Sequence, residues 1–284
     1  MLKKFKPWED LTFTDDYMFK LLMERKRICK GTLNAFLDWN IRSITYFATE
    51  KPLKAGYAAK GVRLDVYLHD ETSRVYDVEI QVLKKKEKPD VDAMMTLAKR
   101  ARFYLSELDT RALERSGLYA DLRPTIVIFF CPFRLFDGRR AVYTFPRICQ
   151  EDPCLTLPDE TALIFISSKN ARSGLSPRAC ALLDYMNGKI TKEPLIAQIE
   201  ESMRTIKRHE TERKIYMTYI MKMREERQDA FTEGKAEGKA EGMNLVMRIV
   251  EQLQKKVPYQ TIATDTHTTL EQVVEIANKF KMAY

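Results

Sequence analysis

The feature that most constrains the fold is a stretch of alternating apolar and polar residues at 62–82, VRLDVYLHDETSRVYDVEIQV, which is interrupted by a polar turn. Apolar side chains at every second position predict two β-strands, each with one buried face. A slip of one residue in their pairing would turn the charged faces into the core, so it is strongly disfavoured. The simplest register is therefore centred on Thr72 and places Asp65 opposite Glu79.

This register sets two like charges against each other. Directly opposed side chains have Cβ atoms about 4.5–5.5 Å apart, where a pair of carboxylates destabilises the sheet. Two explanations remain open. Either the carboxylates face solvent and are neutralised by Arg63 and nearby lysines, or they hold a divalent cation such as magnesium, which binds one or two carboxylates with waters and substrate phosphate. Gln81 lies two residues beyond Glu79 and shares its strand face, which completes the pattern Asp…Glu-x-Gln.

Five segments between residues 10 and 170 carry short motifs in a fixed order. They are DYMFKLLM (16–23), RLDVYLHD (63–70), VEIQV (78–82), RARFYLSEL (100–108) and LRPTIVIFFCPFRLF (122–136). The ordered set resembles the PD-(D/E)XK nuclease superfamily, and more narrowly its transposases, also called recombination-promoting nucleases. The resemblance implies an α/β, restriction-endonuclease-like fold, in which helices flank a mixed sheet and a helical extension follows.

The same resemblance implies an activity, a metal-dependent endonuclease that hydrolyses DNA phosphodiester bonds and is linked to transposition or recombination of mobile DNA. Asp65 and Glu79 would hold Mg²⁺, with Mn²⁺ as a substitute. Gln81 takes the place of the superfamily's usual lysine, and its neutral amide can orient water but brings no positive charge. Asp16 is either a further catalytic acid or a helix N-cap. The residues just before it could fill the N-cap role equally well. The alternative function is an inactive nuclease-fold protein that binds DNA or supports assembly.

Basic residues follow and flank the predicted metal site. The strand that carries Gln81 runs directly into KKKEK, whose lysines would either contact the DNA backbone or form a solvated loop. Arg100 and Tyr104 lie four residues apart on a helix expected to begin after Pro89 and Asp90, so they share a face and either point at the site or pack on the helix surface. The residues expected to contact DNA are Arg63, Lys84, Lys85, Lys86, Lys88, Arg100 and Tyr104.

Beyond the hairpin, the apolar run 125–130 predicts a strand that is covered on both faces, and 161–168 predicts a further strand. From residue 171 onwards the pattern is helical. The repeat EGKAEGKAEG indicates either a flexible helical linker or a close helix–helix contact over its glycines. We expect a nuclease-like domain at 1–170, a helical arm at 171–232, a linker at 233–242 and a small helical unit at 243–284. That unit is either a DNA-reading helix-turn-helix or another helical tip, and the C-terminal helices are the expected surface for homo-oligomers.

Composition narrows the class of protein. The 284 residues carry a net charge of +8 with a pI of about 9.1, which is compatible with a phosphate-rich partner. Five cysteines without a CxxC pair, together with three histidines, argue against a zinc site and favour reduced thiols in the cytoplasm. The basic start has no apolar segment after it, so no signal peptide is expected. The longest apolar run is too short for a membrane span, so we expect no membrane association.

Overall fold

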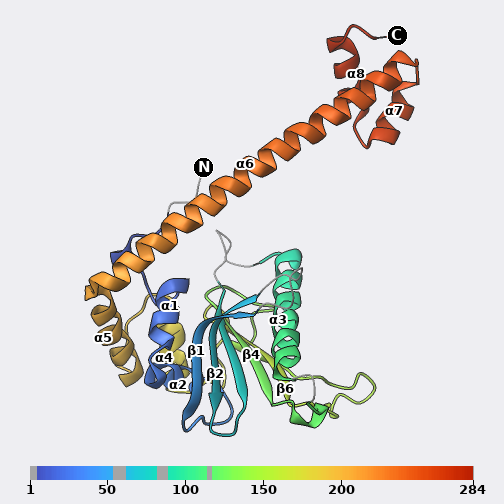
Figure 1. Cartoon of the computed structure of the whole chain (residues 1–284). Helices are drawn as coiled ribbons and strands as arrows, with labels where there is room; N and C mark the ends of the chain where they lie inside the picture. Colours follow the sequence, from blue (N-terminus) through green and yellow to red (C-terminus); the bar gives the residue numbers. More distant parts are fainter. Residues whose placement is uncertain (1–4, 54–61, 82–88, 114–116, 284) are drawn as a thin grey trace. The chain divides into compact units, whose positions relative to one another are not determined.

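A mixed sheet of six strands forms the centre of residues 1–213 (Figure 1). The structure is a computed structural model that describes residues 5–53, 62–81, 89–113 and 117–283. The strand order is β1-β2-β3-β4-β6-β5, with β3, β4 and β6 parallel and the remaining pairs antiparallel. The strands are β1 (Ile44–Leu53), β2 (Val62–Asp70), β3 (Val75–Ile80), β4 (Thr125–Cys131), β5 (Val142–Phe145) and β6 (Thr161–Ser167).

Helices cover both faces of this sheet, so the predicted mixed sheet with flanking helices is confirmed (Figure 1). Short 3₁₀ helices span Trp8–Asp10 and Tyr119–Asp121. The α-helices of the first unit are α1 (Asp16–Met23), α2 (Lys26–Leu33), α3 (Val91–Ala112), α4 (Pro177–Met186) and α5 (Pro194–Arg208).

The predicted hairpin register is confirmed, but its surroundings differ from the expectation. Val66 pairs with Val78, and the same register continued by one residue sets Asp65 opposite Glu79. All six residues of β3 are buried, because β3 lies between β2 and β4 and is covered on both faces. The expectation that each strand has one buried and one solvent-facing side is therefore wrong, and the carboxylates belong to the interior.

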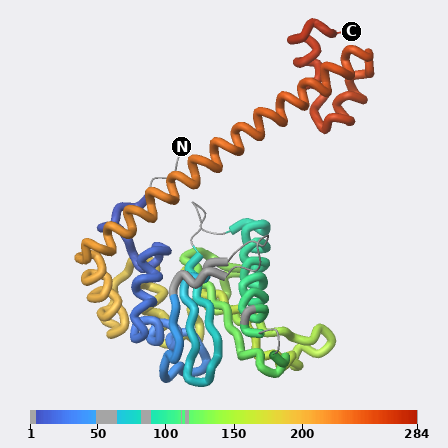
Figure 2. Tube along the Cα trace, in the orientation of Figure 1, coloured from blue at the N-terminus to red at the C-terminus, as the bar shows by residue number. Residues whose placement is uncertain are grey.

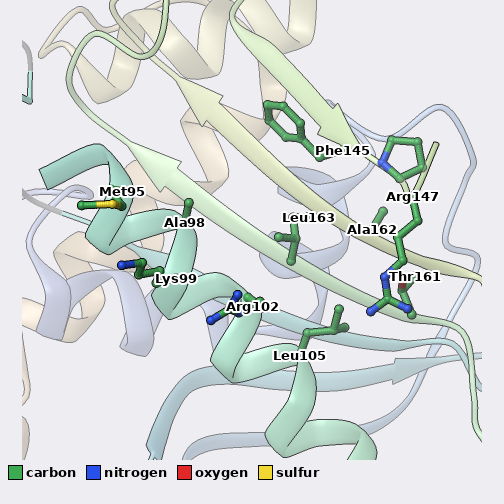
Figure 3. Close-up of a pocket in the computed structure, with 11 residues that line it drawn as sticks. Met95, Ala98, Lys99, Arg102, Leu105, Phe145, Arg147, Thr161, Ala162 and Leu163 are labelled. Carbon is green, nitrogen blue, oxygen red and sulfur yellow. The ribbon is translucent and has the colours of Figure 1, made fainter. Parts of the chain in front are cut away.

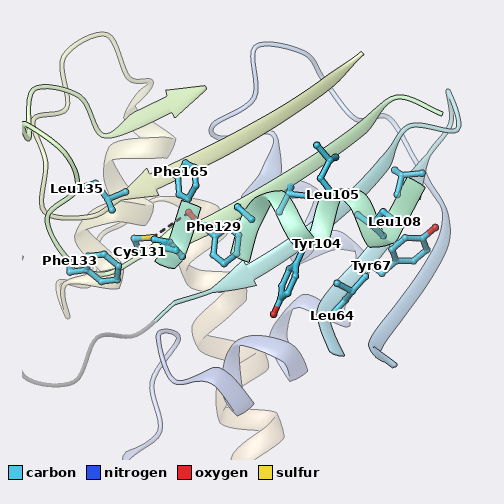
Figure 4. Close-up of a cluster of buried hydrophobic side chains, with 14 residues drawn as sticks. Leu64, Tyr67, Tyr104, Leu105, Leu108, Phe129, Cys131, Phe133, Leu135 and Phe165 are labelled. Carbon is cyan, nitrogen blue, oxygen red and sulfur yellow. Dashed lines mark hydrogen bonds between the residues drawn. The ribbon is translucent and has the colours of Figure 1, made fainter. Parts of the chain in front are cut away.

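Helix α3 packs on one face of the sheet. It begins where expected, since the Asp90 side chain accepts a hydrogen bond from the Ala93 N–H at 2.9 Å. Below the helix, the rings of Phe129 on β4 and Phe165 on β6 stack with centroids 5.7 Å apart. Tyr104 lies on the same apolar layer (Figure 4), and this packing holds α3 against β4.

The other face carries α1 and the helices packed around it. Phe19 of α1 and Phe36 both pack on Phe130 of β4, each with ring centroids 5.7 Å apart. Helices α1 and α5, which are far apart in the sequence, lie side by side (Figure 2), and the indole N–H of Trp8 donates to the Lys207 carbonyl at 3.0 Å. These contacts fix α1 against β2, and α4 and α5 belong to the first compact unit rather than to a separate arm.

The second compact unit is Lys214–Tyr284. It contains most of α6 (Glu210–Gln254), with α7 (Tyr259–Thr266) and α8 (Leu270–Lys279). Helix α6 is continuous through 233–242, where we expected a linker. Its last turns share a small core with α7 and α8, built from Ile249, Leu253, Ile262, Ala263, Val273 and Ala277.

Helices α7 and α8 have the outline of a helix-turn-helix, and Thr269 and Gln272 form the capping box that starts α8. The exposed side of α8 carries Glu271 and Glu275 together with Lys279, so both alternatives for this unit remain predictions. Among the described residues, none of the helices combines the length and the apolar character that a membrane crossing requires.

The glycine repeat in α6 generates a prediction about helix stability. An added Cβ at Gly234, Gly238 or Gly242 meets no atom within 4 Å. Replacing all three with alanine should therefore stabilise the helix, by up to about 1 kcal/mol per site, as measured by circular dichroism during thermal unfolding. Gly31→Ala is the contrasting control, because its Cβ would meet Leu195 Cδ1 at 2.8 Å. A loss of stability in the triple variant would show that the glycines pack closely against another helix.

Candidate active site

Hydrogen bonds between the backbone of one strand and the side chain of the other connect Asp65 on β2 with Glu79 on β3. The Asp65 N–H donates to Glu79 Oε1 at 2.8 Å, and the Ile80 N–H lies 3.4 Å from Asp65 Oδ2. Asp65 is 7% exposed and Glu79 is fully buried. The two carboxylates thus meet as the register predicts, and the explanation in which they face solvent is excluded.

Two cations from different helices balance these carboxylates. Lys20 Nζ of α1 lies 3.0 Å from Asp65 Oδ1, and Arg100 Nη2 of α3 lies 2.7 Å from Glu79 Oε2. The two helices cover opposite faces of the sheet (Figure 1). Each carboxylate is therefore bound by one positive side chain and one backbone N–H, which reduces the cost of burying it.

Arg100 connects several parts of the site. Besides Glu79, it donates from Nη1 to Gln81 Oε1 at 2.5 Å and from Nε to the Tyr104 hydroxyl at 2.8 Å. Its guanidinium also lies over the Tyr104 ring, 5.0 Å from the centroid. Arg100 therefore points at the carboxylates, and Tyr104 joins the site through its hydrogen bond with Arg100, so the two do not merely pack on the helix surface. In this structure Arg100 holds Glu79 and Gln81 in place.

Asp16 reaches the site through Lys20. The N-cap of α1 is Asp15, whose carboxylate accepts from the Thr12 N–H at 2.7 Å, so Asp16 is not the cap. Asp16 Oδ2 instead lies 3.2 Å from Lys20 Nζ, one helical turn further on. Lys20 is 9% exposed, and our sequence analysis gave it no role. The signal was a lysine four residues after an aspartate within the quoted segment DYMFKLLM.

Asp77 is a second residue that the sequence analysis left without a role. It is fully buried on β3, two residues before Glu79, and no donor in the described part of the chain reaches either of its oxygens. Burial, followed by the charges of Glu79 and Asp65, raises the pKa of Asp77 well above its ordinary value. The sequence did contain a signal for Asp77: it lies two residues before Glu79 on one strand, so the two side chains share a face.

Burial also dominates the protonation of the two central carboxylates. It raises the pKa of Glu79 to about 8, with a further contribution from Asp65, while Arg100 and the Asp65 N–H oppose the change. Burial and the charge of Asp16 raise the pKa of Asp65, against the pull of Lys20. For Lys20 itself, burial lowers the pKa, but Asp65 and Asp16 outweigh that and raise it overall. The site therefore holds carboxyl groups that favour either a proton or an added cation.

The donor set suits a hard divalent cation. The part of the chain that the structure describes contains no group of three or more His, Cys, Asp or Glu side chains placed to hold a metal. Asp65 and Glu79 nevertheless supply adjacent carboxylate oxygens, and magnesium requires no more than one or two of these when waters and substrate phosphate complete its ligands. The two residues thus fit the predicted ion.

Several residues predicted to contact DNA are not placed by the structure. Lys84, Lys85, Lys86, Lys88 and the Arg63 side chain lie outside the described residues, so their roles remain predictions. A cavity of about 420 Å³ lies elsewhere, on the other flank of α3 (Figure 3). It lies between α3, with Met95 and Arg102, and the end of the sheet, with Phe145 and Leu163, and it does not include the carboxylates.

The fold and these contacts define a nuclease domain of the PD-(D/E)XK type. The family of PD-(D/E)XK nuclease family transposases matches residues 13–174, more than half of the chain, so the protein belongs to this family. The matched segment includes Asp16, Asp65, Glu79, Gln81 and Arg100. No curated protein matches the chain. The protein is therefore related to nucleases and to transposition, and the resemblance inferred from the motifs is confirmed.

The buried carboxyl of Asp77 should make stability depend on pH. Because its pKa is raised in the folded state, the folded protein keeps a proton that the unfolded chain loses above about pH 4, so wild-type stability falls as pH rises. Asp77→Asn should resemble wild type near pH 4 and be more stable at pH 8, with the difference growing by up to about 1.4 kcal/mol per pH unit.

Denaturant unfolding at pH 4, 6 and 8 measures this difference. Asp92→Asn, at an exposed position on α3, serves as the control and should show no such trend. If the difference between Asp77→Asn and wild type is the same at every pH, Asp77 is not a proton-holding group.

Proposed function

We propose that the protein is a metal-dependent endodeoxyribonuclease that hydrolyses DNA phosphodiester bonds during transposition or recombination of mobile DNA. One observation carries the proposal: the β2–β3 register sets Asp65 and Glu79 side by side in the interior. Buried carboxylates that repel each other are costly for the fold. A divalent cation offsets that cost and explains why both carboxylates occur together inside a nuclease-type sheet.

The chain's own residues divide the work around this pair. Asp65 and Glu79 would hold Mg²⁺ or Mn²⁺, which when bound would polarise the scissile phosphate and lower the pKa of the attacking water. Arg100 keeps Glu79 and Gln81 in fixed positions by donating to both. Gln81 would orient the attacking water through its amide group.

DNA would be positioned along the basic residues near this site. Arg63 and the lysines at 84–88 would contact the backbone, which sets the position of the duplex without reading its sequence. Together with the family, these assignments support DNA as the substrate.

Removing either carboxylate should stop cleavage without unfolding the protein. Asp65→Asn and Glu79→Gln keep the side-chain shape but lose the charge that would bind the ion, so we expect single-turnover nicking of supercoiled DNA with Mg²⁺ to fall by at least about 100-fold. EDTA should abolish wild-type nicking, and Asp92→Asn is the matched control. Folded variants that nick at the wild-type rate would contradict the proposal. Wild-type protein that binds DNA without cutting it would support the inactive alternative.

Metal affinity should depend on pH through Glu79. Its pKa of about 8 means that the ion must displace a proton below that pH. The dissociation constant for Mn²⁺ should therefore rise by about tenfold for each unit that the pH falls from 8 to 6. Above pH 8 it should be constant. Titration calorimetry in buffers of different ionisation enthalpy measures both the affinity and the released proton. An affinity that stays constant from pH 6 to 8 would contradict ionisation of Glu79 as the controlling step.

A further inference from the structure

Lys20 is an unusual residue for its position in the fold. It is one of five buried residues on the eight-residue helix α1, and the other four are apolar (Met18, Phe19, Leu22 and Met23). A buried ammonium group is tolerated only when it is paired. Lys20 satisfies this requirement with two carboxylates, Asp65 at 3.0 Å and Asp16 at 3.2 Å.

The charges around the carboxylates suggest what this lysine does beyond pairing. Phosphodiester hydrolysis adds negative charge to the phosphate, and positive groups placed there stabilise it. Gln81 is neutral, and Arg100 is engaged with Glu79, Gln81 and Tyr104. Among the described residues, Lys20 is the other cation that forms a direct ion pair with a predicted metal ligand.

An ion held by Asp65 would compete with Lys20 for the same carboxylate. Mg²⁺ binds oxygen at about 2.0–2.1 Å, and Lys20 Nζ already lies 3.0 Å from Asp65 Oδ1. Two positive charges so close repel each other strongly. Asp16 also binds the ammonium, at 3.2 Å, so Lys20 can leave Asp65 and keep a carboxylate partner.

We infer that Lys20 exchanges Asp65 for a non-bridging oxygen of the scissile phosphate when the ion and DNA bind, with Asp16 as its tether. The inference rests on the proposed function. In the reaction, a water oxygen bonds to phosphorus while one ester P–O bond breaks, the water gives a proton to solvent, and the leaving sugar oxygen takes a proton from solvent. Lys20 remains protonated throughout and stabilises the phosphate as a point charge.

The decisive variant is Lys20→Gln, studied in the full chain by two measurements. Without the competing ammonium, the affinity for Mn²⁺ in the absence of DNA should rise by about tenfold or more. Single-turnover cleavage of DNA at saturating Mn²⁺ should fall by about 100-fold, which is typical of the loss of one charge-stabilising group. A lysine that only held the fold together would lower both quantities in parallel with stability.

The double variant Lys20→Gln with Gln81→Lys returns a positive charge to the site from the strand. It should cleave at least about tenfold faster than Lys20→Gln alone. It also keeps the net charge of the site, so if the single variant fails to fold, cleavage by the double variant within about tenfold of wild type is expected in its place. Lys30→Gln is the matched control, because Lys30 lies on α2 and donates to the Arg42 carbonyl at 3.0 Å, away from the carboxylates.

The outcomes separate this inference from the proposed function. Wild-type cleavage that persists in folded Lys20→Gln overturns the inference alone, as does a parallel fall in metal affinity and cleavage. A double variant that cuts no faster than Lys20→Gln, or no DNA at all where the single variant is unfolded, also overturns it. Wild-type protein that binds Mn²⁺ and cuts no DNA overturns the proposed function and the inference with it.

Discussion

The repulsion between Asp65 and Glu79 is the interaction that the rest of the site is built to balance. The two side chains meet because their strands pair in a register that keeps the apolar side chains inside, and a slip of one residue would turn them out. Once buried, each carboxylate needs compensation within a few ångströms. Lys20 and Arg100 supply it, and burial raises the pKa of Asp77 on the same strand as Glu79.

The helices on both faces of the sheet follow from this requirement. Helix α3 carries Arg100 and is held on its face by the aromatic layer around Phe129. Helix α1 carries Lys20 and is held on the other face by Phe19 against Phe130. Helix α5 packs against α1, and α4 packs against α5, so both belong to the first compact unit, which extends to Arg213. The packing of the core therefore determines where the charges of the site lie.

Period-two alternation was enough to predict the hairpin, its register and the meeting of Asp65 with Glu79. It could not predict how far they are buried, because burial of both faces depends on β1, β4 and the helices, which join the hairpin from distant parts of the chain. Arg100 was found because residues four apart share a helix face. Lys20 was missed because its pairing with Asp65 is a long-range contact. The sequence could not decide whether 233–242 is a linker or part of a continuous helix, because glycine lowers helix propensity without preventing a helix.

The most direct test of the account is a crystal structure of the protein with Mn²⁺, read from the anomalous signal of the metal. The account predicts one strong peak within bonding distance of both Asp65 and Glu79, with Lys20 withdrawn from Asp65 and still beside Asp16. A manganese-soaked crystal with no peak between the two carboxylates, and with Lys20 and Arg100 in their present contacts, would contradict it.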